Sequence, residues 1–341
     1  MIALWFITLW LACASSGDIN VVIEPESAPQ PEASQPEASQ PEASQPETSQ
    51  PEETGEPTSE PSFEGGDWRF LSVGETHNCA IDTDQKAVCW GYDSSGQLDV
   101  PEDSFVEVDA GLWQSCGINT AGEVLCWGCQ GNDLGQCDAP SGTFISLSTG
   151  PYHGCAIEES GTIQCWGCEN NNNGQCSPPS GSFVQVESGS AFSCARTSDG
   201  SIDCWGCQGT PQNHGQCTPP SGSFVDFALG SDNGCARTSD NEVTCWGRDI
   251  FSESSPPEQL FLDVSLGHIH GCGLGTDGSP TCWGCAQGPE AELGQCEPIS
   301  GTFSVIGSGT GHSCAMNNEG IQCWGCGDGS WQFDVGQCSS P

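Results

Sequence analysis

The residues with the clearest capacity for chemistry in this sequence are its cysteines, which number 25 among 341 residues. A Cys-Trp-Gly triplet occurs seven times, and another cysteine precedes the cysteine of each triplet by ten residues, or by nine in the last copy. In five copies the triplet extends to Cys-Trp-Gly-Cys, and a Gly-Gln-Cys follows. Thiols at such spacings can form disulfides, coordinate zinc or exchange electrons, and each chemistry demands a different set of partners.

The segment between the first two cysteines of each repeat has the pattern of a β-hairpin. The sixth residue after the first cysteine is glycine in five copies and Asn241 in another, while the first copy departs from the pattern with Gln85. Glycine and asparagine accept the positive φ that a three-residue hairpin loop requires. Such a loop places the two cysteines opposite each other, within disulfide reach. We therefore expect seven hairpin disulfides: Cys79–Cys89, Cys116–Cys126, Cys155–Cys165, Cys194–Cys204, Cys235–Cys245, Cys272–Cys282 and Cys314–Cys323.

A second pair of cysteines occurs in five of the seven repeats. The other two repeats lack both members together, with Tyr92 and Arg248 in place of the first. Joint presence and absence within one chain favours pairing of the two. We expect five loop disulfides: Cys129–Cys137, Cys168–Cys176, Cys207–Cys217, Cys285–Cys296 and Cys326–Cys338. The twelve expected pairs use every cysteine except Cys13.

Zinc coordination and thiol redox chemistry are the competing interpretations. A zinc site needs four ligands, yet two repeats contain only two cysteines. Cys-Trp-Gly-Cys resembles a thioredoxin-type motif, but that chemistry needs one thiolate at the start of a helix rather than five copies after strands. An even number of paired cysteines in an exported chain favours disulfides.

The N-terminal residues predict export. Residues 1–13 form an uninterrupted apolar run, too short to span a bilayer and placed where a signal peptide lies. Cys13 after Leu-Ala resembles a bacterial lipobox, which predicts lipidation of Cys13, although Trp10 replaces the usual aliphatic residue. We expect an outer-membrane or cell-surface lipoprotein held in the membrane only by this lipid. Cleavage after Ala14 is the alternative and would give a secreted protein.

Residues 14–67 predict a disordered, acidic, proline-rich linker. A QPEAS motif recurs every five residues, and proline at that interval prevents helices and sheet ladders. The glutamates repel one another, and the segment has too little apolar surface to offset the entropy of ordering. An extended linker of this kind would hold the folded part away from a surface.

The periodicity of the remaining chain predicts the fold. The hairpin cysteines recur every 37 to 42 residues, and most repeats open with a phenylalanine and an alternating stretch such as Phe105–Val108, typical of a strand. The small residue that would face each tryptophan fits a sheet packed on both faces. We expect an all-β, seven-bladed β-propeller over residues 68–341. Its repeats are expected at residues 68–104, 105–143, 144–182, 183–223, 224–260, 261–302 and 303–341.

The repeat resembles that of the regulator-of-chromosome-condensation family. It contains a glycine, a histidine, a turn glycine, Trp-Gly and Gly-Gln in the family's order, and the resemblance covers all seven units. The resemblance implies a seven-bladed propeller, and the added cysteines are similar to a disulfide-rich variant in exported bacterial proteins. The family's best-known member is a nucleotide exchange factor on chromatin. No residue of this sequence maps onto its exchange loops, so that activity is the least favoured.

Charge and motif content narrow the function further. The formal net charge is −41, with 5 basic and 46 acidic residues, which disfavours binding to nucleic acid or anionic lipid. No nucleophile elbow, metalloprotease or phosphate-loop motif occurs, so we expect no catalytic residue, metal or cofactor. The histidines at the repeat position, such as His77 and His153, are interpreted as structural. His214 and His268 lie outside the register and have no evident catalytic partner in the sequence.

The candidate binding residues lie in the segments between the loop cysteines, whose lengths vary. Variable loops on a rigid ring are where propellers usually bind. The candidates are Asn170, Asn171, Asn172, Asn173, Ile250, Phe251, Trp331 and Phe333. The sequence therefore predicts an exported propeller that binds an unidentified protein or surface macromolecule. An envelope enzyme with carboxylates converging in the central channel and a purely structural envelope protein are the alternatives.

Overall fold

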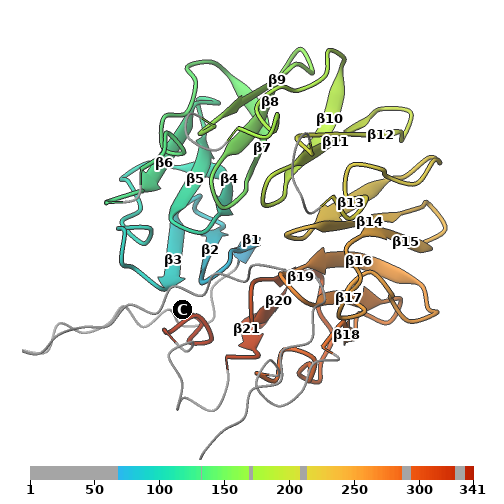
Figure 1. Ribbon diagram of the computed structural model, residues 1–341. Coiled ribbons are helices and arrows are strands. Elements are labelled where there is room, and N and C mark those ends of the chain that lie inside the picture. Colours follow the sequence, from blue (N-terminus) through green and yellow to red (C-terminus); the bar gives the residue numbers. More distant parts are fainter. Residues whose placement is uncertain (1–67, 132, 169–171, 208–212, 286–292, 327–334) are drawn as a thin grey trace, which may run out of the picture. The chain divides into compact units, whose positions relative to one another are not determined.

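The computed structural model describes residues 68–341 except 132, 169–171, 208–212, 286–292 and 327–334. Within these residues the chain forms seven three-stranded antiparallel sheets, each made of strands consecutive in the sequence. Figure 1 shows the sheets side by side around a central axis, as the blades of a propeller. The predicted all-β, seven-bladed propeller is thus confirmed. The expected signal peptide and linker, residues 1–67, lie outside the described residues.

Each blade runs from the channel outwards in chain order. The first three blades comprise β1 (Trp68–Val73), β2 (His77–Asp82) and β3 (Ala87–Gly91); β4 (Phe105–Ala110), β5 (Gln114–Asn119) and β6 (Val124–Gly128); β7 (Phe144–Thr149), β8 (Gly154–Glu158) and β9 (Ile163–Trp166). The next two comprise β10 (Phe183–Ser188), β11 (Ser193–Thr197) and β12 (Ile202–Trp205); β13 (Asp226–Leu229), β14 (Asn233–Arg237) and β15 (Val243–Gly247). The last two comprise β16 (Phe261–Leu266), β17 (Gly271–Gly275) and β18 (Pro280–Trp283); β19 (Val305–Ser308), β20 (Ser313–Asn317) and β21 (Gly320–Trp324). None of the described residues belongs to a helix long and apolar enough to cross a membrane.

The second and third strands of each blade pair in the register expected from the cysteine spacing. In the fourth blade Cys194 lies opposite Cys204 and Ser193 lies opposite Trp205, and the other six blades repeat this register. The turn residue has a positive φ in every blade, including Gln85 at 65°. The first turn therefore adopts the common conformation although its residue is neither glycine nor asparagine.

The first strand of most blades contains a β-bulge that interrupts the alternation expected from the sequence. Phe105 lies opposite Asn119 and Glu107 opposite Ile118, so that Val106 is an extra residue in β4. Bulges occur at the same place in β1, β7, β10 and β16. One extra residue shifts the phase of the side chains, so Phe105 is buried while Val106 points to solvent.

The hydrophobic core is divided among the seven interfaces between neighbouring blades. At the first interface Cys79 and Ile81 pack against Phe105, Val108 and Trp127 of the second blade. Equivalent clusters occupy the other five sequential interfaces and the interface between the last and first blades. Each hairpin disulfide therefore lies inside an apolar contact between blades rather than on the surface.

A buried tryptophan hydrogen bond crosses every one of these interfaces. Trp127 Nε1 donates to the backbone oxygen of Gln97, 2.9 Å away and 30 residues earlier in the chain. The same bond to a residue of the preceding repeat recurs for Trp166, Trp205, Trp246, Trp283 and Trp324. Because indole Nε1 is a donor that needs a partner when buried, the repeated Trp and Gly-Gln motifs together fix neighbouring blades.

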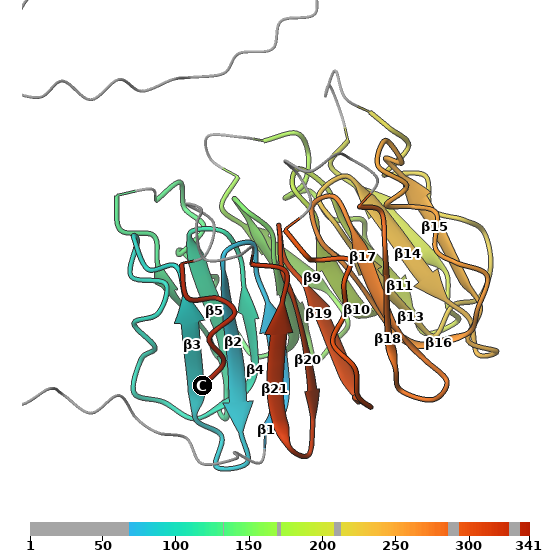
Figure 2. The same ribbon diagram turned by 90° about the horizontal axis from the view of Figure 1, so that it is seen from below.

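The ring is closed by the C-terminal segment. After β21 the chain returns to the first blade, where Figures 1 and 2 show its end beside β3. The backbone oxygen of Gln337 accepts hydrogen bonds from Trp90 Nε1 at 3.1 Å and from Asn78 Nδ2 at 2.9 Å. The closing interface thus uses the same tryptophan bond as the others, between residues 247 apart in sequence.

Candidate functional site

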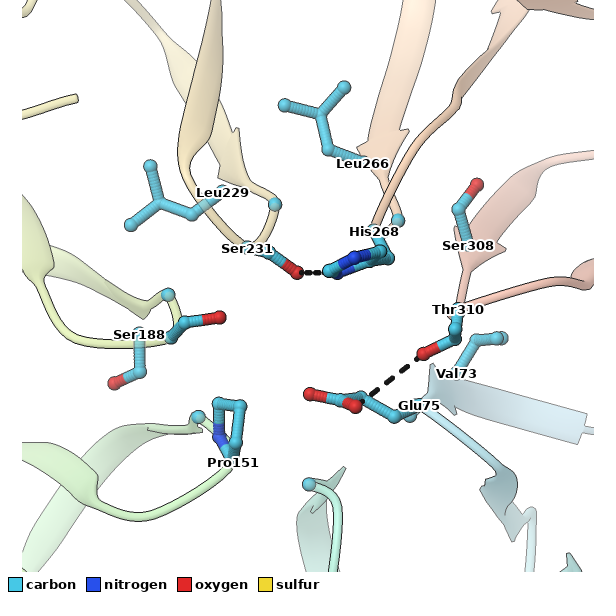
Figure 3. Close-up of a pocket in the computed structure, with 18 of the residues that line it drawn as sticks. Val73, Glu75, Pro151, Ser188, Leu229, Ser231, Leu266, His268, Ser308 and Thr310 are labelled. Atoms are coloured by element: carbon cyan, nitrogen blue, oxygen red, sulfur yellow. Dashed lines mark hydrogen bonds between the residues drawn. The ribbon is translucent and has the colours of Figure 1, made fainter. Parts of the chain in front are cut away.

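Residues of all seven blades line the mouth of the central channel. The loops between the first and second strands surround a cavity of about 480 Å³ (Figure 3). Backbone hydrogen bonds link several of these loops, among them Glu75 N to Gly111 O and Thr310 N to Glu75 O. A second cavity of about 680 Å³ is lined by the first strands themselves and shares wall residues with the mouth. We call the side carrying this mouth the loop face.

Two polar contacts lie at the mouth, and Figure 3 shows them apart from each other. Thr310 Oγ1 donates to Glu75 Oε2 at 3.5 Å, and burial raises the pKa of Glu75, an effect that this hydrogen bond partly offsets. His268 Nδ1 lies 2.7 Å from Ser231 Oγ. The sequence does not show this contact, because Ser231 and His268 lie 37 residues apart and meet only where adjacent blades pack.

The Ser231–His268 pair has the hydroxyl–imidazole contact of a catalytic nucleophile and its base. Among the residues that the structure describes, it lacks the further group that would orient the histidine. A catalytic serine needs a histidine whose other ring nitrogen is oriented by a third group. No carboxylate of the described residues is hydrogen-bonded to His268, while the guanidinium of Arg248 donates to its backbone oxygen. The contact therefore positions the His268 ring at the rim.

Carboxylates converge in the channel, as the alternative enzyme hypothesis requires, but they are engaged by backbone. Glu107 Oε1 accepts from Leu147 N at 3.0 Å, and Asp109 Oδ2 accepts from Thr149 N at 2.6 Å. The same bond joins Asp263 Oδ2 to a backbone N–H of the next blade. The first strand of each blade is a sheet edge with unpaired N–H groups, so these side chains cap the edge of the following blade.

The channel environment disfavours ionisation of these acids. Burial is the main cause, and it raises the pKa of Glu107 to about 7 and that of Asp263 to about 6. The pKa of Glu187 rises well above its ordinary value because of burial and the neighbouring Asp109. Burial also raises the pKa of Asp109, against four hydrogen bonds that lower it.

Four buried histidines at the repeat position join neighbouring blades. In His77, His153 and His270, Nε2 lies 2.8 Å from a serine Oγ of the next blade, and His312 Nε2 lies 2.7 Å from Asn78 Oδ1 across the closing interface. Burial lowers the pKa to about 3 for His77 and His312 and to about 4 for His153 and His270. These histidines are neutral at pH 7 and their contacts are those of structural residues.

The histidines should make the propeller sensitive to acid, and His153 offers a direct test. Its folded pKa of about 4 lies below the unfolded value of 6.5, so protons bind preferentially to the unfolded chain as the pH falls from 6.5 to 4. We expect His153 to cost about 3 kcal/mol of the free energy of unfolding across that window. The matched variant is His153→Gln, because Gln114 occupies this position naturally in the second blade.

Urea unfolding of the wild type and of His153→Gln at pH 7, 5.5 and 4 measures this effect. The difference in stability between the two proteins should shift by about 3 kcal/mol in favour of the variant as the pH falls. The raised pKa values of the channel acids act in the opposite direction between about pH 7 and 4.5, but they contribute equally to both proteins. A pH-independent difference would contradict the buried neutral state of His153.

The expected disulfide partners are joined in the structure. The seven hairpin pairs have Cα–Cα distances of 3.9 to 4.1 Å and the five loop pairs 6.0 to 6.3 Å. These 24 cysteines are therefore not free thiolates for zinc or redox exchange. Among the described residues no group of three or more histidine, cysteine or acidic side chains is arranged to hold a metal ion. Cys13 lies outside the described residues.

The structure places only part of the expected binding residues. Asn172 is exposed and lines a groove beside the Cys168–Cys176 disulfide, and Asn173 is half-buried next to it. Asn170, Asn171, Trp331 and Phe333 lie outside the described residues. The described members lie in the segments that follow the third strands.

The fifth blade orders its segment by charge instead of a disulfide. Arg248 Nε donates to the buried Glu253 at 2.7 Å, and a second ion pair joins Arg248 to Asp232 at 3.5 Å. The guanidinium lies 5.6 Å from the centre of the Phe251 ring. Phe251 is thereby half-buried, while Ile250 remains 62% exposed on the loop face.

A set of exposed aliphatic side chains at the opposite ends of the first strands was not predicted from the sequence. They follow the opening phenylalanine of five successive blades: Val106, Ile145, Val184, Val225 and Leu262. The sequence does contain a repeated phenylalanine–aliphatic dipeptide that could have indicated this set. An alternating strand pattern does not reveal the β-bulge that leaves the second residue of the dipeptide exposed.

Comparisons with known proteins agree with this architecture. The family model of the regulator of chromosome condensation (RCC1) repeat matches residues 68–97, 144–175, 183–216 and 224–251. Two similar solved structures are ectodomains of plant receptor kinases. CR4 of Physcomitrella patens has 23% identity and a TM-score of 0.61, over 77% of this chain and 75% of that one. ACR4 of Arabidopsis thaliana has 22% identity and a TM-score of 0.61, over 77% and 97%.

A third similar structure is Prp20p of Saccharomyces cerevisiae. It has 16% identity and a TM-score of 0.57, over 70% of this chain and 80% of that one. At these identities the structural likeness concerns the fold alone. A comparison with curated protein sequences gives no match. The repeat matches and the seven sheets together show that residues 68–341 form a β-propeller with RCC1-type repeats.

Proposed function

We propose that this chain is an exported protein-binding module anchored to the cell surface by lipidated Cys13, with residues 14–67 as the tether. The observation that carries the proposal is the set of twelve disulfides, because so many cross-links persist only in an oxidising compartment. The apolar run at residues 1–13 supports the same location.

Binding is favoured over catalysis by what the ring presents. The segments between the loop cysteines differ in length, and variable loops on a rigid frame are common binding surfaces. Contacts between blades occupy the channel carboxylates of Glu107, Asp109 and Asp263 and the repeat histidines. Glu187 accepts a hydrogen bond from Gln185 of its own strand. Prp20p has been characterised for binding to Gsp1p and histones, and the plant relatives are receptor ectodomains. These likenesses support a protein partner as a class.

Mass spectrometry of the unreduced mature protein tests location and anchoring together. We expect an N-terminus at an acylated Cys13 and all other cysteines oxidised, and we expect Cys13→Ser to release the protein from membranes. An unmodified N-terminus after Ala14 would replace anchoring by secretion. Free thiols throughout the protein would contradict export itself.

Binding is tested by adding the purified, oxidised full chain to intact cells and following retention against concentration. Saturable retention that protease treatment of the cells abolishes would support a protein partner. Retention that does not saturate, on cells or on isolated envelope, would contradict the binding function and leave a structural role.

A further inference from the structure

The face opposite the loop face carries a ring of exposed aliphatic side chains close to the channel. Val106, Ile145, Val184, Val225 and Leu262 are 41 to 56% exposed, and we call them the aliphatic ring. Each sits at or just before the start of the innermost strand of its blade, beside the phenylalanine that is buried between blades. The side of the propeller that carries them is termed the turn face.

The aliphatic ring is not a requirement of the fold. Ser304 follows Phe303 at the equivalent position of the seventh blade, and Arg69 follows Trp68 in the first. The backbone therefore accepts polar and charged residues here. Scattered apolar residues on a surface need no explanation, but these five occupy equivalent positions on consecutive blades of one face.

A ring of carboxylates borders the aliphatic ring on its outer side. Each aliphatic residue follows a phenylalanine whose N–H donates to the turn between the second and third strands of the preceding blade, as Phe144 N does to Gly122 O at 2.8 Å. These five turns each expose a carboxylate, and together they form the acidic ring: Asp84, Glu123, Glu159, Asp199 and Asp240.

The acidic ring contributes five exposed carboxylates to the turn face. Hydrogen bonds from Thr197 and Ser201 lower the pKa of Asp199, which keeps this carboxylate charged well below neutral pH. The exposed cations near this face, Arg69 and Lys86, both belong to the first blade. The turn face of the second to sixth blades thus combines an apolar centre with a negative border.

We propose that the turn face binds a protein segment whose apolar side chains are bordered by lysine and arginine. This inference rests on the proposed protein-binding function and assigns the chemistry of one partner. Burial of the aliphatic ring would supply affinity, and opposite charges at the rim would steer association and fix orientation. An anionic membrane is disfavoured by the acidic ring, and a second copy docked face to face would set carboxylates against carboxylates.

The experiment measures binding of a labelled amphipathic helical peptide of leucine and lysine to the oxidised full chain by fluorescence anisotropy. A leucine–glutamate peptide and a serine–lysine peptide serve as matched probes. The aliphatic variant is Ile145→Ser, Val184→Ser and Val225→Ser, which introduces the residue that the seventh blade carries naturally as Ser304. The acidic variant is Asp84→Asn, Glu159→Gln and Asp240→Asn. The control is Asp93→Asn, which removes an exposed carboxylate in the segment after β3, outside both rings.

We expect the aliphatic variant to weaken binding of the leucine–lysine peptide at least about tenfold. The acidic variant should weaken binding and flatten its dependence on salt, while Asp93→Asn should match the wild type. Equal affinity of the wild type and the aliphatic variant would overturn the proposal, as would equal binding of either matched probe. Circular dichroism and an unchanged urea midpoint establish that the variants are folded.

The failure of this inference is distinguishable from failure of the proposed function. Saturable retention on cells that persists in the aliphatic variant but is lost with Ile250→Ser would leave protein binding in place and move it to the loop face. Sedimentation showing a dimer of the wild type that the aliphatic variant abolishes would assign the turn face to a second copy and overturn the heterologous partner.

Discussion

A fully reduced and alkylated chain is expected to remain unfolded in native buffer. The apolar core is split into seven small clusters, and each contains cysteines of a hairpin disulfide. A short disulfide contributes roughly 2–3 kcal/mol by restricting the unfolded chain, while net stabilities are about 5–15 kcal/mol. Loss of twelve such cross-links exceeds any plausible net stability, even though their contributions do not add fully.

The measurement is tryptophan fluorescence and circular dichroism after reduction and alkylation in denaturant, followed by removal of the denaturant. A sample taken through the same cycle without reductant is the control and should recover its native spectrum. Recovery of a cooperative urea transition by the alkylated chain would contradict this prediction.

The two classes of disulfide should also differ in their rates of reduction under native conditions. One cysteine of every hairpin pair has no exposed surface, as Cys194 illustrates, whereas both cysteines are half-buried in the loop pairs Cys207–Cys217 and Cys285–Cys296. Pulsed alkylation should therefore label these two loop pairs first. Earlier labelling of the hairpin cysteines would mean that the interfaces between blades open readily.

Removal of residues 335–341 is expected to open the ring. The truncation deletes the backbone oxygen of Gln337, which accepts hydrogen bonds from Trp90 and Asn78. Leaving two buried donors without an acceptor costs about 1–3 kcal/mol each, so the free energy of unfolding should fall by about 2–6 kcal/mol. The truncated chain should also become sensitive to protease between the first and last blades.

A matched control separates ring closure from loss of the last disulfide. The double variant Cys326→Ser and Cys338→Ser removes the cross-link but keeps Gln337, and we expect it to lose less stability than the truncated chain. Urea unfolding of the wild type and both variants makes the comparison. Equal losses would show that the disulfide, rather than the Gln337 contacts, holds the ends together.

Local features of this protein were predictable from the sequence because they depend on residues close together in the chain. A hairpin with a turn at Gly200 leaves one register for Cys194 and Cys204, and the structure has that register. Seven copies of the same local unit then predict seven blades, because a unit of this size can bury its two faces only against its neighbours.

The contacts between repeats could not be predicted in this way. Whether a given tryptophan bonds to a glutamine 30 residues earlier, or His268 to Ser231, depends on how adjacent blades are placed. The channel carboxylates are another case, since the sequence shows Glu107 as an ordinary strand acid. Only the packed ring shows it capping the edge of the next blade.

The sequence by itself determined the number of repeats, the disulfide partners and the class of fold, because these follow from spacing within some forty residues. The tertiary structure decided which side chains face the channel, which cross the interfaces and which lie exposed. A single bulge residue such as Val106 reverses the direction of a side chain without altering the pattern that predicts the strand. Closure of the ring by Gln337 likewise depends on the accumulated geometry of seven blades, which no local segment contains.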